Sequence, residues 1–133
     1  MATFVPFFVA ESAARWLSEA MDLARLRAGI HGRPLDLFEV MRERALSEPP
    51  PRATLDDVVM HFEYLREAVG VAHLGIGGDF DGTEYVTLGL EDVASYPRLF
   101  DSLRDRRWSA AELDAVAGRN LLRVMRDVEA VAH

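Results

Sequence analysis

Residues 73–82 read HLGIGGDFDG, and this stretch does most to determine the fold that the sequence predicts. A short apolar run ends at two glycines, and two aspartates, Asp79 and Asp81, follow. The apolar run is typical of a buried strand, and the glycines let the backbone turn sharply or approach a ligand closely. Carboxylates at the end of a strand commonly serve catalysis or metal binding. The stretch therefore predicts an acidic site at one end of a sheet.

The composition is that of an acidic globular domain. The 133 residues are 50% hydrophobic and 28% charged, with a net charge of −7. This charge argues against nucleic acid and anionic membranes as partners, because both need basic patches. No apolar run approaches the ~20 residues that span a bilayer, and the first residues lack the basic flank of a signal peptide. We therefore expect a cytoplasmic protein by default.

Two residue types are missing from the sequence. The absence of cysteine rules out disulfides and thiolate metal ligands. The absence of lysine, with all fifteen basic residues being arginine, rules out Schiff bases and phosphate loops that depend on lysine. These gaps narrow the chemistry that the two aspartates can serve.

Helical patterns fill most of the remaining chain. Residues 1–9 predict a short buried strand that runs into a loop, and residues 71–76 predict a second strand. Apolar periodicity and capping residues predict helices over residues 11–28, 34–47, 54–69, 97–106, 110–117 (stopped by Gly118) and 120–130. Two strands do not form a self-sufficient sheet, and strands buried on both faces call for parallel neighbours. We therefore expect the chain to begin in the middle of a fold.

Two other kinds of site also contain closely spaced aspartates, a calcium loop and a phosphotransferase loop. A calcium loop of the EF-hand type that starts at Asp79 needs Gly at its sixth position and Glu at its twelfth, where this sequence has Glu84 and Leu90. That reading is rejected. Residues 79–83 also look like the nucleophile loop of an aspartyl-phosphate phosphotransferase. That fold needs a distant lysine, so this reading stays as the weaker alternative.

A longer match is more specific than the acidic motif. Three blocks resemble the C-terminal part of the membrane (renal-type) dipeptidases, metallopeptidase family M19. They are residues 70–82, 89–97 (GLEDVASYP) and 120–124 (NLLRV), in the family's order and at compatible spacing. Residues 1–6 and 54–67 look like that family too. The resemblance thus covers nearly the whole chain.

The resemblance implies an α/β fold, the C-terminal portion of a (β/α)8 barrel of the TIM type, amidohydrolase-like, with two strands and about six helices. Residues 1–133 would be a single segment that holds the last two β/α units, with a helical insertion over about residues 11–53. Residues 1–6 would be the seventh strand and residues 74–78 the eighth. Family members are hydrolases that use two zinc ions to cleave dipeptides.

The resemblance also implies particular site residues. Asp79 falls on the family's last-strand aspartate, which contacts the amino group of the substrate and handles a proton, so it is predicted as both catalytic and substrate-binding. Phe8 stands where some members have a substrate-contacting tyrosine, so it is predicted to line the substrate pocket. For Asp81, stabilisation of the loop is the expected role.

The resemblance implies that this chain contains no metal ligands, because the family's zinc ligands all precede the seventh strand. The sequence's own histidines, His31, His61, His73 and His133, lack the spacing typical of a zinc site. The segment alone is therefore expected to be inactive, with a possible tendency to self-associate or form a homodimer. A non-catalytic interaction or pseudoenzyme module on the same scaffold remains the alternative.

Overall fold

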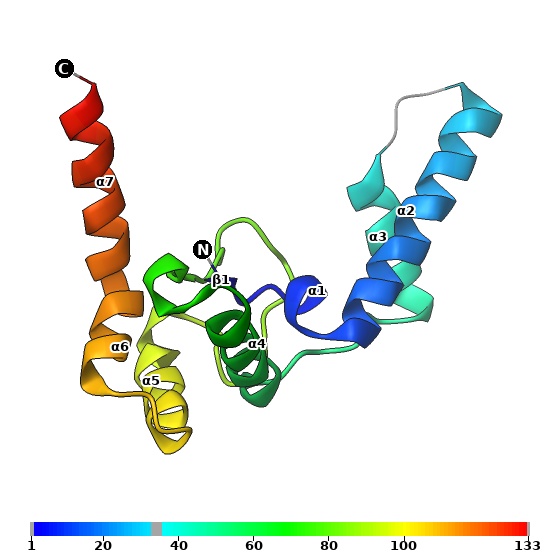
Figure 1. Ribbon diagram of the computed structural model, residues 1–133. Helices are drawn as coiled ribbons and strands as arrows, with labels where there is room; N and C mark the ends of the chain where they lie inside the picture. The colour runs from blue at the N-terminus through cyan, green and yellow to red at the C-terminus, as the bar shows by residue number, and fades with distance from the viewer. Residues whose placement is uncertain (1, 33–35, 133) are drawn as a thin grey trace.

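The structure, a computed structural model, describes residues 2–32 and 36–132, and these residues are mostly helical. Its elements in chain order are β1 (Ala2–Thr3), α1 (Pro6–Val9), α2 (Glu11–His31), α3 (Leu37–Ser47), α4 (Leu55–Val69), η1 (Val71–His73), β2 (Ile76–Gly77), η2 (Val93–Ser95), α5 (Tyr96–Asp105), α6 (Ala110–Asp114), η3 (Ala115–Arg119) and α7 (Asn120–Val131). Two arms, the α2–α3 pair and α7, rise on opposite sides of a central body (Figure 1). The described helices include none that is both long and apolar enough to cross a bilayer.

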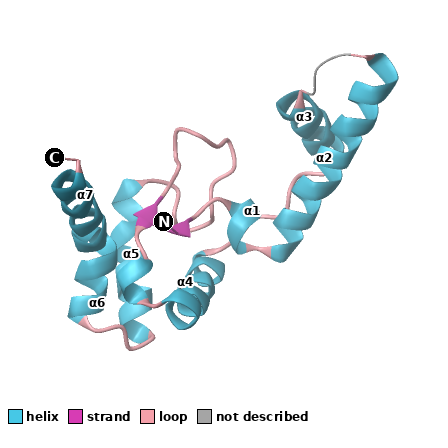
Figure 2. Cartoon of the chain, turned by 45° about the horizontal axis from the view of Figure 1, so that its top comes forward, coloured by secondary structure: helices cyan, strands magenta, loops and turns pink. Residues whose placement is uncertain are grey.

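The two predicted strands pair with each other in parallel but are much shorter than expected. Ala2 pairs with Ile76, and Thr3 pairs with Gly77. The Phe4 amide then donates a hydrogen bond of 3.2 Å to the Gly77 carbonyl. Figure 2 shows this small sheet at the centre of the molecule, beneath the long loop that follows β2. Each strand has one neighbour among the described residues, which explains why pairing stops after two residues.

Part of each predicted strand forms a helical turn instead, Pro6–Val9 in the first and Val71–His73 in the second, so these two assignments were wrong in extent. Pro6 has its φ fixed near the helical value and starts α1. Gly70, at φ 80, ends α4 and leads into the 3₁₀ turn η1, where the His73 amide donates to the Gly70 carbonyl at 3.1 Å. The expectation that both faces of the strands are buried was also wrong for β2, whose residues are half-buried.

Helix α4 follows the sequence prediction closely. Thr54 accepts a hydrogen bond from the Asp57 amide, and the Asp57 carboxylate accepts one of 2.8 Å from the Thr54 amide. This capping box satisfies two amides that the helix itself leaves unpaired. The helix places Val58 and Phe62 in the main core, and it ends at Gly70 as predicted.

The first arm is longer than its apolar pattern predicted. Helix α2 continues through Gly29 and ends at Gly32, whose φ of 60 is left-handed. The predicted start of the next helix, residues 34 and 35, lies outside the described residues, and α3 itself begins at Leu37. Arg44 of α3 ties the pair together, because its guanidinium contacts Glu19 of α2 at 2.5 Å and donates to the carbonyl of Trp16 of α2 at 3.1 Å.

The helical path breaks at Gly118, as predicted. Gly118 has non-helical φ and ψ of 167 and −20, which places a kink between two helices inside the segment η3. No loop separates the two helices, because α7 begins at Asn120, directly after η3. Asn120, the first residue of α7, contacts the segment that precedes β2. Its side-chain amide donates to the carbonyls of Val71 and Leu74, at 2.7 and 2.8 Å.

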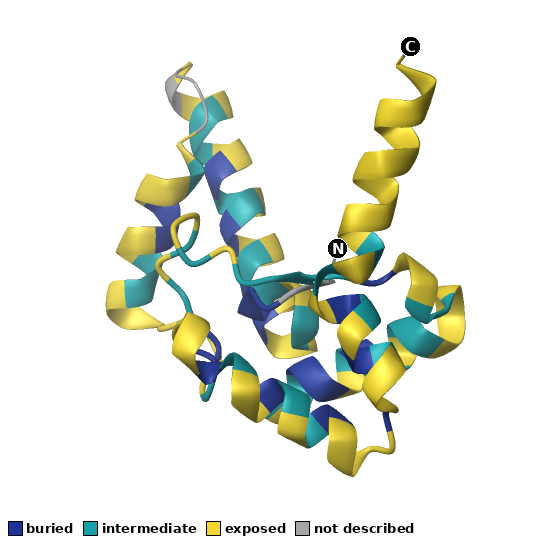
Figure 3. Cartoon of the chain, turned by 90° about the vertical axis from the view of Figure 1, so that its left-hand side faces the viewer, coloured by how far each residue is buried: buried dark blue, intermediate teal, exposed yellow. Residues whose placement is uncertain are grey.

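The main core lies between α4, α5, α6 and the strands. Its fully buried side chains include Phe62, Leu99, Leu103 and Trp108. Trp108 stacks its edge against Phe62 with ring centroids 6.1 Å apart. Figure 3 shows that buried positions concentrate in the central body, whereas α7 carries exposed residues almost throughout. None of the described residues of α7 is buried.

Candidate functional site

The parallel pairing of β1 and β2 brings the segments that follow them to the same edge of the sheet. Phe7 and Phe8 follow β1, and Asp79 follows β2. These residues line one pocket, whose volume is about 560 Å³. Helix α3 forms the opposite wall through Phe38, Met41 and Arg42. The two residues predicted as site residues therefore meet in one hollow at the carboxyl ends of the strands, where α/β enzymes carry their active sites.

Asp79 occupies an unusual backbone conformation. Its φ is 53, in the left-handed region that Asp and Asn tolerate better than most residues. Its carbonyl accepts a hydrogen bond of 3.0 Å from the Gly82 amide, which closes a tight turn over residues 79–82. A Cβ on Gly82 would overlap Oδ1 of Asp79, so glycine leaves room for the carboxylate. Strained backbone of this kind is a common feature of functional sites.

The ring of Phe80 supports the same turn from the core side. It lies 6.0 Å from the ring of Tyr96, which in turn meets Phe4 edge-on at 5.6 Å. A Cβ on Gly78 would overlap the Phe80 ring, so this glycine permits the close approach. Burial raises the pKa of the Tyr96 hydroxyl, whereas a hydrogen bond with the Gly78 backbone opposes that shift. These contacts hold the turn in place and leave Asp79 at the surface of the pocket.

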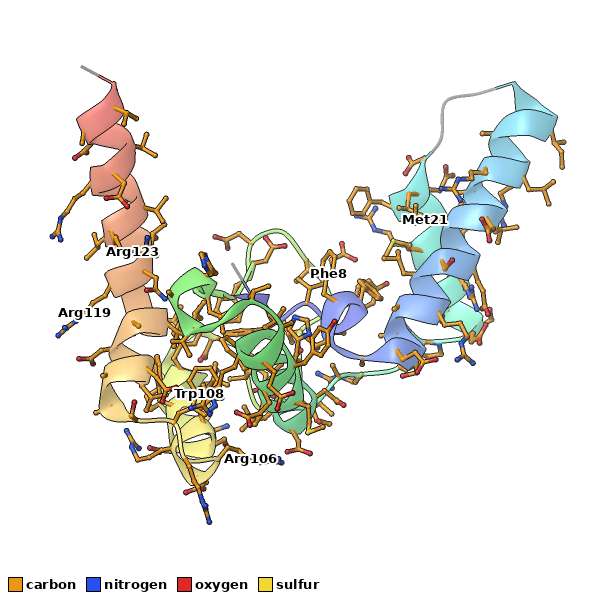
Figure 4. The ribbon with its side chains drawn as sticks, viewed as in Figure 1. Phe8, Met21, Arg106, Trp108, Arg119 and Arg123 are labelled. Atoms are coloured by element: carbon orange, nitrogen blue, oxygen red, sulfur yellow. The ribbon has the colours of Figure 1, made fainter. Side chains whose placement is uncertain are left out.

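An aromatic cluster borders the pocket and contributes Phe7 and Tyr85 to its lining. Phe7 stacks on Trp16 with centroids 6.1 Å apart, and Tyr85 meets Phe7 edge-on at 5.5 Å. Burial raises the pKa of the Tyr85 hydroxyl, with a further contribution from the Glu84 carboxylate. Phe8 projects away from this cluster and is 65% exposed. In Figure 4 it lies on α1, between the central loops and the α2–α3 arm.

The charges around the pocket are unequal. Four charged residues line it: Asp79, Asp81, Glu84 and Arg42. Arg42 pairs with Glu84 at 3.2 Å across the rim. The Asp79 and Asp81 carboxylates are left as the uncompensated charges of the lining, which favours a cationic group in the pocket.

Within residues 2–32 and 36–132, no three side chains of the types that bind metals lie close enough together to hold an ion. His61 lies on α4, and burial lowers its pKa. His73 lies in η1 at the other end of β2 and faces a separate cavity of about 250 Å³, which Asn120 and Arg123 also line. The side chain of His31 and the whole of His133 lie outside the described residues.

Sequence reasoning missed the α3 wall of the pocket. Phe38, Met41 and Arg42 were assigned to a helix without a functional role, because neither their spacing nor their type marks a site. The long packing of α3 on α2 brings them to Asp79. The sequence offers no signal for them, because the exposure of Phe38, at 67%, becomes visible only in the structure.

A carboxylate beside a partly apolar pocket, at the ends of parallel strands, is an arrangement that many enzyme sites share. The whole chain, residues 1–133, matches the family model described as membrane dipeptidase (peptidase family M19). The chain belongs to this family, as its sequence blocks predicted. The match over the whole chain removes the phosphotransferase alternative.

Curated relatives agree with this assignment. The chain is 46% identical over 89 residues to an uncharacterized dipeptidase of Schizosaccharomyces pombe, which covers 66% of the chain and 22% of that protein. It is 48% identical over 80 residues to dipeptidase aclJ of Aspergillus oryzae, covering 60% and 19%. It is 47% identical over 79 residues to human dipeptidase 3, covering 59% and 16%. The chain thus spans about a fifth of the length of these relatives.

Proposed function

We propose that this chain is a segment of a dipeptidase and contributes Asp79 to an active site that hydrolyses dipeptides. The observation that carries the proposal is the family match over residues 1–133, combined with the meeting of Asp79 and Phe8 in one pocket. Named dipeptidases at 46–48% identity support the substrate class.

Asp79 is proposed to bind the free amino group of the dipeptide. A carboxylate forms a strong, charge-assisted hydrogen bond with an ammonium group. The same carboxylate can accept a proton while water attacks the peptide carbonyl and return it to the leaving amine. The exposed position of Asp79 on the pocket wall supports both roles. Phe8 is proposed to contact the substrate through its ring alone, since it lacks the hydroxyl of a tyrosine.

The strands β1 and β2 are proposed to be the last two strands of a (β/α)8 barrel. Their parallel pairing supports this, because parallel strands occur almost only in sheets that helices cover on both faces. The length of the relatives also supports this assignment to the last two strands. About four-fifths of each relative lies outside the match and has room for the other strands of a barrel.

Zinc is the cofactor that the family implies, and the residues described here do not fit it. They offer no group of three His, Asp or Glu side chains that could hold an ion. We therefore propose that any zinc ligands come from residues outside this chain and that the chain alone does not hydrolyse dipeptides. Robust hydrolysis by the purified chain, in the presence of zinc and a dipeptide, would refute this part of the proposal.

A chimera tests the contribution of the segment to an enzyme. The matching segment of dipeptidase aclJ is replaced by the corresponding residues of this chain, which are 48% identical to it. The chimera should hydrolyse dipeptides. A chimera that folds, by circular dichroism and gel filtration, yet has no activity would contradict the proposal.

A non-catalytic interaction module is the second candidate, and exposed apolar surface is the observation that favours it. The chain exposes 8643 Å², whereas a compact monomer of its mass, 14.9 kDa, exposes about 7,000 Å². Exposed apolar side chains of α7 contribute to this surface, among them Leu121, Val124 and Val128. This surface supports self-association of the isolated chain. A stable monomer in analytical ultracentrifugation would argue against it.

A further inference from the structure

The pocket beside Asp79 has an apolar wall that the family resemblance does not assign. Phe38 and Met41 of α3 face the strand ends across the pocket, with Phe8 of α1 beside them. Phe8 is 65% exposed and Phe38 is 67% exposed, although both line the same hollow. Large exposed aromatic side chains that meet in a pocket are typical of a ligand site, because a ligand removes their surface from water.

The wall is held firmly enough to select a ligand. Met41 is 7% exposed and packs with Trp16 and Ala20 of α2. The Arg44 guanidinium joins α3 to α2 through Glu19 at 2.5 Å and donates to the Trp16 carbonyl at 3.1 Å. Helix α3 therefore presents Phe38 and Met41 from a fixed position, which favours discrimination by shape.

The two walls differ in chemistry. The α3 and α1 side is apolar, whereas the β2 side carries Asp79 and Asp81, whose charges have no partner in the lining once Arg42 has paired with Glu84. A ligand that complements both walls has an ammonium group next to a large apolar side chain. A dipeptide with an apolar first residue is such a ligand, and a pocket of about 560 Å³ has the size of a small-molecule site.

We propose that Phe38 and Met41 determine specificity, so that the site prefers dipeptides whose first residue has a large apolar side chain. The proposal rests on the proposed function, in which Asp79 holds the amino group, and adds the partner of the side chain. Burial of a leucine side chain against this wall should lower the dissociation constant at least about tenfold relative to glycine.

The test titrates the purified chain with Leu-Gly and Gly-Gly and follows backbone amide signals by NMR. The wild-type chain should bind Leu-Gly about tenfold more tightly, with shifts at residues that line the pocket. Phe38→Ala should reduce this ratio to a few-fold or less. Leu46→Ala is the matched control, because Leu46 is 90% exposed on the same helix and does not line this pocket.

Asp79→Asn separates this inference from the proposed function. This substitution should weaken the binding of both dipeptides alike and leave the ratio of their dissociation constants unchanged. If Asp79→Asn has no effect while Phe38→Ala removes the preference, the role of Asp79 fails and the specificity wall stands. An unchanged ratio in Phe38→Ala overturns the inference, and so does the absence of binding by either dipeptide.

Discussion

Asn120 fastens the long C-terminal helix to the segment that leads into β2, and its removal should destabilise the fold measurably. Its side-chain amide donates to the carbonyls of Val71 and Leu74, at 2.7 and 2.8 Å. These carbonyls lie in and directly after η1, just before the strand that delivers Asp79. Asn120→Ala removes the side-chain amide that donates both hydrogen bonds.

The expected loss follows from these two hydrogen bonds. Each contributes about 0.5–1.5 kcal/mol, and a carbonyl left without a donor in a half-buried position adds to the cost. Asn120→Ala should therefore lower the free energy of unfolding by about 2 kcal/mol. Arg123→Ala is the matched comparison, since Arg123 donates a single exposed hydrogen bond of 2.7 Å to the Ala72 carbonyl. It should cost less than about 1 kcal/mol.

Urea unfolding followed by circular dichroism measures both variants at a fixed protein concentration. Hydrogen exchange adds a local measurement, because Asn120→Ala should reduce protection most in η1 and around Leu74. Equal losses for Asn120→Ala and Arg123→Ala would refute the view that the two carbonyl contacts of Asn120 anchor the helix.

Three further predictions concern pH, the Asp79 turn and α7. The amide and hydroxyl of Ser109, followed by the Arg66 guanidinium, lower the pKa of the Glu112 carboxyl. The stability that the Glu112 carboxylate contributes is therefore fully present above the unfolded pKa of about 4.3 and is lost as pH falls through the lower folded pKa. Glu112→Gln should make the urea midpoint of unfolding depend less on pH across this acid range. An unchanged dependence on pH would contradict the assignment. Gly82→Ala should displace the Asp79 carboxylate and weaken dipeptide binding, while the free energy of unfolding changes by less than about 1 kcal/mol. An unaltered affinity for dipeptides would count against the contact between residue 82 and the Asp79 carboxylate. Leu121→Ser with Val128→Ser should reduce self-association in sedimentation velocity, whereas Arg126→Ser with Glu129→Ser should not, and the reverse order would place the interface elsewhere.

Local signals predicted the helices well and the strands poorly. The capping box of Thr54 and Asp57 is written in adjacent residues, so the start of α4 could be predicted from the sequence. Strand length depends on neighbouring strands, and with a single partner each strand shrinks to two residues. The break at Gly118 could also be predicted, because glycine tolerates the non-helical backbone conformation that ends a helix.

Only part of the site could be predicted, because only some of its residues carry a local signal in the sequence. Asp79 was visible as a carboxylate at a strand end, and Phe8 entered through the family resemblance. Their roles stay predictions, although both residues line one pocket. The opposite wall of the pocket depends on how α3 packs on α2. Contacts between distant segments of this kind leave no periodic pattern in the sequence.

Catalysis by Asp79 is tested most directly by comparing Asp79→Asn with Asp81→Asn in the active chimera. Asparagine keeps the size of aspartate and tolerates the left-handed conformation of residue 79, so the fold should persist. Asp81→Asn serves as the control, since it lines the same pocket two positions along the turn. If Asp79 is catalytic, Asp79→Asn lowers kcat/KM for a dipeptide by about a hundredfold or more, the contribution of a general acid–base group, while Asp81→Asn changes it only a few-fold. Full activity of a folded Asp79→Asn chimera would contradict the central claim.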